Sequence, residues 1–575
     1  MRWTWRIWLA LCCTMSIAVE VVAGVRVLVV GDGSTAARLT DVRDKVLSRL
    51  PGTGNAVDTF NNDGGGVPSL ALLKTYDVAL VYTDTGLDDG VALGNVLADY
   101  VDAGGNVVEM SFSYSTGSIG VQGRWSFGGY RAMSASSQLS SASSLGSRAV
   151  PSHPILAGVS AFSGTFRNGG TPNAGVYTIA SWTDGNPLVM TVPGKNGRIA
   201  SLNFFPPSNA VGAGFWDQNT DGARLMANAC VWAAGGRVDV LLLGSPSTSV
   251  WTTDVRQTLL RFGRVSGRID ILNIQTGTPT AETLRGYDSV LVFTDASPQD
   301  PTLLGNRLAD YVDAGGGVVV GAFANFTGTG LSGRLVQGGY LPLTQGPSAS
   351  GTALTLGAIA VPGHPILEGV ASFSSGSSGL HVDCSLRSGA TLVVSWSNGR
   401  PLLATSRPSV GKVVALNFYP PSSNARADFW PSSSDGGALL GNALVWSARN
   451  DVDLLVLANL ADPRTNDVVN KINADGRING TVSTYSTAGP APALAFLSRF
   501  DAVLAFPSAT PAEPGTLGDV LAHYSDAGGG VVDAVYSGAS TGIAGRWASG
   551  AYSGISSGSV RLGESSLGDV QLPNH

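Results

Sequence analysis

The chain has 575 residues, of which 43% are hydrophobic and only 13% are charged, and its net charge is −6. Plentiful apolar residues and scarce charges exclude a disordered chain, and the lack of a basic run argues against nucleic acid as a partner. A chain of this length predicts several domains rather than one compact core.

The N-terminus has the features of a secretory signal peptide. Arg2 and Arg6 form a basic region, residues 7–19 are mostly apolar, and the Val-Ala-Gly at 22–24 supplies the small residues of a cleavage site. We expect residues 1–24 to be removed and the mature protein to be secreted. The alternative is a buried N-terminal helix or an uncleaved anchor. No later segment has about 18 uninterrupted apolar residues, so we expect no membrane span after signal removal.

Strands and helices alternate in the segment that follows. Residues 25–30 form a continuous apolar run, which is typical of a strand buried on both faces of a parallel sheet. We expect further strands at 57–60, 77–82 and from 107, helices at 35–50, 91–101 and 221–233, a long loop or small insertion at 113–150, and several partly antiparallel strands within 176–205. The alternation predicts a mainly parallel sheet with helices on both faces.

This pattern recurs along the chain. The string "LADYVDAGGNVVEM" at Leu97 returns as "LADYVDAGGGVVVG" at Leu308 and as "LAHYSDAGGGVVDA" at Leu521. Units of this size are too long for solenoid repeats, so we expect tandem domains.

The histidines give the period of the repeat. His153, in "HPIL", is followed 211 residues later by His364 in the same string, and a further 211 residues later by His575 at the last position. The expected domains are repeat 1 at 25–235, repeat 2 at 236–449 and repeat 3 at 450–575. We expect the third copy to be truncated, without its late strands and closing helix.

The order of strand, helix, "AGGG", strand and sharp turn, followed by "HPIL" and by "LNFFPP" at 202–207, resembles the class I glutamine amidotransferase-like superfamily, including its ThuA-like branch. The resemblance implies tandem three-layer α/β domains of flavodoxin-like fold with mainly parallel sheets. It also implies a Cys nucleophile on the turn after the "AGGG" strand, and a His and a Glu after the late strand that activate it.

The residues at those positions depart from the superfamily. The nucleophile position holds Ser111, Ala322 and Val535 in the three copies, and the His and Glu positions hold Phe205 and Pro207 in the first copy and Tyr419 and Pro421 in the second. None of the four residues at the His and Glu positions can accept a proton from a nucleophile near neutral pH. We therefore expect the repeats to be non-catalytic.

An arginine beside an aromatic residue recurs after the sharp turn. Arg124, Arg334 and Arg546 lie in "GRW" or "GRL" strings, and Trp125 and Trp547 follow two of them. Such a pair is suited to a sugar or an anionic ligand, so these five residues are the candidate binding residues. The alternative is that each arginine holds the insertion against the body of its domain.

Other candidate residues favour structural roles. His153 and His364 lack a second histidine or an acidic cluster at metal spacing, so a turn role is preferred to a metal site. The "GDGS" at 31–34 is interpreted as a plain turn rather than a phosphate loop, because the other copies lack it. Cys230 and Cys384 occupy different places in their repeats, so we expect no disulfide between them. We expect neither a metal nor a cofactor.

Two functions follow from these observations. The first is a secreted, non-catalytic protein of tandem repeats that binds an extracellular ligand, a carbohydrate or a protein, or serves as a surface module. The alternative is an extracellular hydrolase acting on glycans or amides. An enzyme should bring titratable groups together at the strand ends, whereas a binding module should show aromatic and small residues there.

Overall fold

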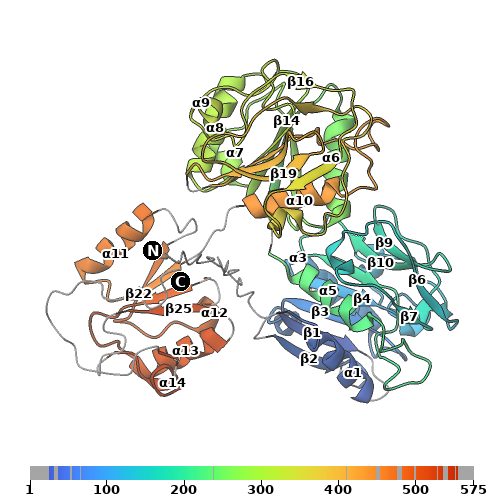
Figure 1. Ribbon diagram of the computed structural model, residues 1–575. Helices are drawn as coiled ribbons and strands as arrows, with labels where there is room; N and C mark the ends of the chain where they lie inside the picture. The colour runs from blue at the N-terminus through green and yellow to red at the C-terminus, as the bar shows by residue number, and fades with distance from the viewer. Residues whose placement is uncertain are drawn as a thin grey trace, which may run out of the picture.

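The computed structural model describes residues 25–31, 36–51, 55–64, 66–236, 238–409, 411–448, 454–475, 482–497, 500, 502–526, 529–534, 542–550 and 552–553. The expected signal peptide, Val535 and His575 lie outside these residues. Figure 1 shows three α/β bodies, coloured blue to green, green to orange and orange to red, each with helices packed on a sheet. Each body falls within one of the intervals expected for the repeats.

The sheet of the first repeat has a parallel half and an antiparallel half. The parallel strands run in the order β2 (Ala56–Asn61), β1 (Arg26–Gly31), β3 (Val78–Tyr82), β4 (Asn106–Met110) and β11 (Ile199–Leu202). The antiparallel strands β10 (Pro187–Val192), β9 (Tyr177–Trp182), β6 (Ser143–Arg148) and β7 (Ser163–Gly164) extend it. The parallel order is that of flavodoxin-like folds.

Helices cover both faces of this sheet, because alternate residues of each buried strand point to opposite sides. Val27 and Val29 of β1 pack with α1 (Ala36–Leu47) and α5 (Gly222–Ala234), while Leu28 and Val30 pack with the helices of the other face. Those helices are α2 (Leu70–Leu73), α3 (Gly90–Asp102) and α4 (Arg124–Phe127). The result is a three-layer domain.

The second repeat has the same architecture. Its parallel strands are β13 (Ile269–Asn273), β12 (Val240–Ser245), β14 (Ser289–Thr294), β15 (Gly317–Gly321) and β21 (Val413–Leu416), followed by antiparallel β20 (Pro401–Ser406), β19 (Thr391–Trp396) and β17 (Leu356–Ile359). One face carries α6 (Ser249–Phe262) and α10 (Gly436–Ser447), and the other carries α7 (Ala281–Arg285), α8 (Pro301–Asp313) and α9 (Arg334–Gln337).

The described part of the third repeat holds the first four strands of the same order. These are β23 (Val482–Ser486), β22 (Leu454–Ala458), β24 (Ala502–Ala505) and β25 (Gly530–Asp533), with helices α11 (Pro463–Asp475), α12 (Leu494–Leu497), α13 (Pro514–Asp526) and α14 (Gly545–Ser549). All pairings within this sheet are parallel.

The fold class expected from the sequence, tandem flavodoxin-like α/β domains with mainly parallel sheets, is confirmed. The expected loop at 113–150 contains helix α4 and strands β5 (Gln138–Leu139) and β6, and β6 joins the main sheet. Its Ser/Gly-rich sequence hides the strand because β6 pairs outside the apolar centre of the sheet and most of its residues are partly exposed. Over the described residues, no helix combines the length and the apolar character that a membrane crossing requires.

Candidate functional site

The residues that the superfamily resemblance implies for a catalytic site lie at the carboxyl ends of the parallel strands. At the turn after β4, Ser111 is fully buried and its hydroxyl donates to Oδ1 of Asn203 at 2.9 Å. Asn203 itself donates to the carbonyls of Asn168 and Pro187 at 2.9 and 2.8 Å. The serine therefore serves a buried network that ties strands together, and in the second repeat its position is Ala322, also fully buried.

Aromatic rings cluster at the position where the superfamily would carry its His. We call the rings of Phe112, Phe205 and Phe215 in the first repeat, and of Phe323, Tyr419 and Phe429 in the second, the aromatic plug. Phe112 stacks on Phe205 with centroids 5.3 Å apart, and Phe323 stacks on Tyr419 at 5.7 Å. Five of the six rings are no more than 8% exposed, Phe215 being the exception. The carboxyl ends of these strands are therefore filled with closely packed aromatic rings.

The charged side chains around the plug are already engaged. Arg38 pairs with Asp84 and lies over the ring of Phe215 at 5.1 Å. In the second repeat, Arg426 pairs with Asp428 at 2.6 Å and lies over the ring of Phe429 at 4.1 Å. These carboxylates are held by guanidinium groups, which does not suit them to act as general bases.

In the second repeat, the turn after β15, where the superfamily's nucleophile would lie, falls within the described residues. Asp295 accepts hydrogen bonds from the amide and hydroxyl of Ser247. Burial, and then the negative charge of Asp295, raise the pKa of the Tyr419 phenol well above its ordinary value. The phenol at the superfamily's His position therefore stays protonated and can neither activate nor replace a thiol.

The two recurrent histidines cap turns. Nδ1 of His153 accepts from the amide of Ile155, and Nδ1 of His364 accepts from the amide of Ile366, both at 3.2 Å. Each opens a short 3-10 helix, η2 (Pro154–Leu156) or η3 (Pro365–Leu367). The interpretation as turn residues is confirmed. In the part of the chain that the structure describes, no three His, Cys, Asp or Glu residues gather as metal ligands.

The two cysteines are free and buried. Burial raises the pKa of the Cys230 thiol and of the Cys384 thiol to about 12. Since the thiolate is the reactive form, neither residue is suited to nucleophilic catalysis at neutral pH.

The candidate arginines lie on the surface and are paired with the preceding helix. Arg124 pairs with Asp99 and Asp102 of α3, and its guanidinium donates to the hydroxyl of Tyr130 at 3.0 Å. The second and third repeats repeat the arrangement with Arg334, Asp310, Asp313 and Tyr340, and with Arg546, Asp526 and Tyr552. We call this group the arginine clamp. It holds the start of the insertion against the helix, and ligand binding by these arginines stays a prediction.

The two candidate tryptophans lie in the domain cores. Trp125 is fully buried and its indole donates to the buried carboxylate of Glu109 at 2.8 Å. Trp547 is 4% exposed and donates to Asp533 at 3.2 Å. Both rings stack on the tyrosine of their own arginine clamp. This burial leaves little of either ring for a ligand, and binding by either stays a prediction.

The sequence reasoning missed the two carboxylates that hold these indoles. Glu109 and Asp533 occupy equivalent places in an otherwise apolar strand, and Val320 stands there in the second repeat. The repeats that have the acid have tryptophan in the "GRW" string, whereas the second repeat has Leu335. The acid and the tryptophan thus vary together between repeats, and this covariation could have predicted their contact from the sequence.

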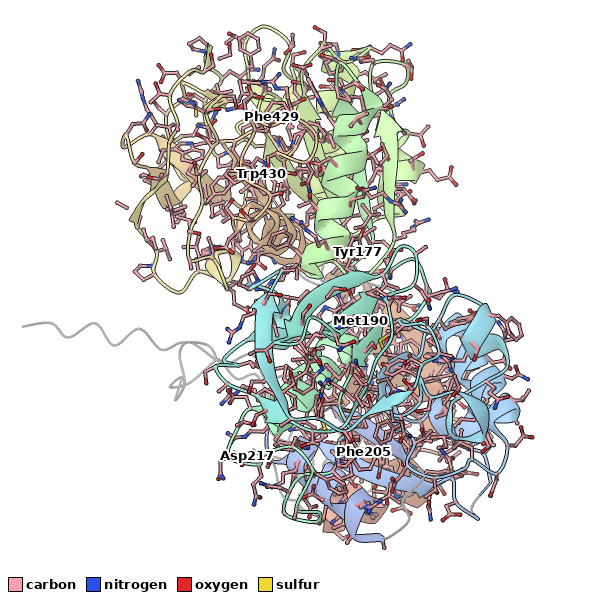
Figure 2. The ribbon with its side chains drawn as sticks, turned by 90° about the vertical axis from the view of Figure 1, so that its right-hand side faces the viewer. Tyr177, Met190, Phe205, Asp217, Phe429 and Trp430 are labelled. Carbon is pink, nitrogen blue, oxygen red and sulfur yellow. The ribbon has the colours of Figure 1, made fainter. Side chains whose placement is uncertain are left out.

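A cavity of about 400 Å³ lies between the first and second repeats. It is bounded by the β10–β11 hairpin and Trp232 of the first repeat and by the end of α6 and the following loop of the second. Figure 2 shows Tyr177 near this junction, whereas Phe205 of the aromatic plug lies at the far end of the first repeat. The cavity is therefore separate from the superfamily's usual site.

Basic groups predominate around this cavity. The charged residues in its lining are Lys195, Arg198, Arg256, Arg268 and Asp270. Nε of Arg268 lies 3.2 Å from Asp239 and 3.8 Å from Asp270, so these three charges leave a net charge of −1. Lys195, Arg198 and Arg256 then give the lining a positive excess.

All three of these cations are also anchored to backbone, and Nζ of Lys195 donates to the carbonyl of Gly128 at 2.8 Å. Burial lowers the pKa of the Arg198 guanidinium to about 9, which keeps it charged at neutral pH, and it donates to the carbonyl of Trp232. Nε of Arg256 donates to the carbonyl of Ile269 at 2.8 Å, while its side chain is otherwise open to solvent. The cavity thus combines fixed positive charge with an open side. No single motif in the sequence signalled it, because its two walls belong to different repeats.

Comparison with known proteins returns similar solved structures but no family. No family model matches the chain, and no curated protein matches it. Similar solved structures include a cytoplasmic protein from Salmonella typhimurium (17% identity, covering 37% of this chain and 100% of that one, TM-score 0.27) and a ThuA-like protein from Parabacteroides merdae (15%, 37% and 91%, TM-score 0.27). An exo-β-1,4-mannosidase from an Opitutaceae bacterium is similar at 15% identity, with 42% of this chain and 41% of that one covered and a TM-score of 0.25. The solved structures that are similar at this low identity include ThuA-like proteins.

Proposed function

We propose that this protein is a secreted, non-catalytic binding protein built from tandem amidotransferase-like repeats. The observation that carries the proposal is the aromatic plug, which fills the carboxyl ends of the strands with stacked rings in the two repeats where this edge is described. A site of that composition lacks the paired nucleophile and base that acyl transfer or hydrolysis requires.

The competing function is an extracellular hydrolase, and one residue speaks for it. Tyr419 puts a hydroxyl near Asp295 at the superfamily's His position. Burial and that carboxylate both raise the pKa of the phenol, so the reactive phenolate is disfavoured. The first repeat has Phe205 at the same position, which removes the hydroxyl altogether.

The binding site we assign is the cavity between the first and second repeats. Its positive excess and mixed apolar and polar walls suit a small anion such as the carboxylate of an acidic sugar. A ligand of about 13 heavy atoms at about 0.3 kcal/mol per atom gives a Kd near 1 mM, an affinity that repetition along a chain would raise.

The test uses the whole secreted chain and two titrations. Calorimetry with D-glucuronate should show binding near 1 mM, and the same titration with uncharged D-glucose should show none. Arg256→Glu, which reverses a charge in the cavity, should weaken glucuronate binding about tenfold or more. Arg285→Glu, an exposed arginine on α7, is the matched control and should leave binding unchanged.

Catalysis is tested separately on a panel of nitrophenyl glycosides and amides. We expect no turnover above the spontaneous rate. Turnover that disappears in Tyr419→Phe would overturn the non-catalytic assignment, and equal binding of glucuronate by the wild type and Arg256→Glu would overturn the assignment of the cavity.

A further inference from the structure

The contact between the first and second repeats, which we call the first junction, is made by the end of α6 and the arginine that follows it. Gly263 directly follows α6 with φ of +65°, and its carbonyl accepts from Nε1 of Trp232 at 2.7 Å. The guanidinium of Arg264 donates to the carbonyl of Ser152 at 3.0 Å. Phe262, the last residue of α6, packs with the core of the first repeat. Domains joined by a few such contacts can separate without unfolding.

His153 of the first repeat is enclosed by this junction. Its ring packs on Trp232 with centroids 5.6 Å apart, and a Cβ on Gly263 would lie 2.3 Å from its Nε2, so only glycine fits there. Covered by the second repeat, His153 is 1% exposed, whereas the equivalent His364 is partly exposed. The ring of His153 therefore cannot turn toward water while the two repeats are docked.

The surroundings of His153 fit only the neutral ring. Nδ1 accepts from the amide of Ile155 at 3.2 Å, and protonation would place a second N–H against that amide. Nε2 has no hydrogen-bond partner among the described residues. The charged groups that face the ring are the cations Arg264 and Arg198, and Glu368, paired with Arg264 at 3.1 Å, is largely exposed. A protonated ring would therefore add a third positive charge to an enclosed site.

The first junction and the cavity described above share their walls. Arg198 and Trp232 line the cavity from the first repeat, and Arg256 and Gly263 line it from the second. Separation of the repeats would move Arg256 away from Arg198 and take the cavity apart. An anion that contacts both walls therefore binds the docked arrangement and not the open one.

We propose that acid opens the first junction through His153 and thereby releases the anion that, on the function proposed above, the cavity binds. Uptake of a proton by His153 favours the open arrangement, in which the ring reaches water. The anion favours the docked arrangement, so proton and anion oppose each other through one equilibrium. An anion bound near neutral pH is given up in an acidic environment.

The size of the effect follows from the pKa of His153 in the two arrangements. In the docked arrangement burial, followed by the charges of Arg264 and Arg198, lowers this pKa from 6.5 to about 3. The equilibrium constant for opening should therefore rise about thirtyfold between pH 7.5 and pH 5. Arg198, with a pKa of about 9, keeps its charge over this range. The carboxyl of D-glucuronate, with a pKa of about 3.5, stays ionised as well.

Hydrogen exchange of the last-turn amides of α6 in the whole chain, corrected for the intrinsic rate, measures the opening. Without ligand, the opening constant of the wild type should rise about thirtyfold from pH 7.5 to pH 5, and that of His153→Gln should stay constant. His364→Gln, at the equivalent turn of the second repeat, is the matched control and should keep the wild-type rise. If His153→Gln unfolds the first repeat, seen as lost protection of β4, His153→Asn takes its place, because asparagine can still accept from the amide of Ile155.

The coupling to the anion is measured at pH 7.5, where about 10 mM D-glucuronate should lower the opening constant about tenfold for a Kd near 1 mM. An opening constant that ignores pH, or that rises equally in His153→Gln, would overturn the proposal. Calorimetric binding of glucuronate that leaves the opening constant unchanged would overturn it too, because the anion would then bind both arrangements. Failure of the binding function differs from both: calorimetry shows no binding, and the release is disproved, while the acid-dependent opening persists.

Discussion

The first and second repeats differ in the side chains that pack beside the strand before the sharp turn. These side chains are polar or charged in the first repeat and apolar in the second. In the first repeat, Glu109 of β4 accepts from Trp125 and from Ser113, and Nε of Arg131 lies 3.9 Å from it. All four side chains are nine-tenths buried or more. The second repeat has Val320, Leu335, Ala324 and Leu341 at the corresponding positions, and all four are buried as well.

The third repeat shows an intermediate solution. Asp533 accepts from Trp547 at 3.2 Å and from the hydroxyl of Ser553 at 2.6 Å, and Ser553 stands where Arg131 does in the first repeat. In the second repeat all members of the network have changed, whereas the third repeat keeps the tryptophan as Trp547 and replaces Glu109 by Asp533 and Arg131 by Ser553. The first repeat thus fills this space with polar side chains that contact one another and the second with apolar ones, while the acid of the third repeat is only partly buried, which lowers the cost of leaving it without the arginine.

The largest expected effect comes from breaking this network in part. Arg131→Leu removes the only cation facing Glu109 among the described residues and leaves a buried carboxylate uncompensated, which should lower the free energy of unfolding of the first repeat by about 3–5 kcal/mol. The quadruple variant Glu109→Val, Ser113→Ala, Trp125→Leu and Arg131→Leu installs the second repeat's set, and its stability should lie within about 2 kcal/mol of wild type. Hydrogen exchange of β4 in the whole chain measures both.

The reciprocal change provides the control for that comparison. Leu341→Arg puts a guanidinium among the apolar residues of the second repeat and should destabilise β15 while leaving β4 unchanged. If Arg131→Leu were as stable as the quadruple variant, the interpretation of the network as a unit would be wrong.

The sequence predicted the sheet well because buried parallel strands are continuous apolar runs. The strand expected at 77–82 and the helix expected at 91–101 lie within one or two residues of β3 and α3. It did not predict α2, whose four residues are too few to show a helical period. It also placed Trp125 in a binding site, because a tryptophan beside an arginine in a Gly-rich segment gives no indication that a distant carboxylate will bury it.

The junction was equally hidden from local pattern. "HPIL" predicted a capped turn, which the structure confirms, but the contact of His153 with Gly263 joins two repeats and has no local signature. The absence of the superfamily's His and Glu could be read from the sequence at Phe205 and Tyr419. The sequence did not predict that these rings stack into an aromatic plug, because the stacked residues come from segments far apart in the chain.

A smaller effect should separate the covered histidine from the uncovered one. Burial, followed by the charges of Arg264 and Arg198, lowers the pKa of His153 from 6.5 to about 3, whereas the pKa of the half-buried His364 is lowered by burial alone. When the first and second repeats separate, His153 regains its ordinary pKa and binds a proton that it does not bind in the closed junction. The contribution of His153 to the stability of this junction is therefore fully present above pH 6.5 and is lost as the pH falls toward 3. The slope approaches about 1.4 kcal/mol per pH unit.

Hydrogen exchange of η2 between pH 5 and 7.5, corrected for the intrinsic rate, measures this slope. His153→Gln should flatten it, and His364→Gln should change the exchange of η3 less. Equal slopes in the wild type and His153→Gln would mean that the histidine does not report on the junction.

The smallest effect is expected at the arginine clamps, which differ in their number of carboxylates. Arg124 faces Asp99 and Asp102, whereas the third repeat has His523 in place of the first of these, so Arg546 faces Asp526 alone. All these groups are exposed, and salt screens charges of this kind within about 10 Å at 0.1 M. Arg124→Ala should therefore lower the melting temperature of the first repeat slightly at low salt, less at high salt, and more than Arg546→Ala does in the third. If Arg124 serves only as part of the arginine clamp, Arg124→Ala should leave glucuronate binding unchanged. Loss of binding in that variant would show that Arg124 binds the ligand.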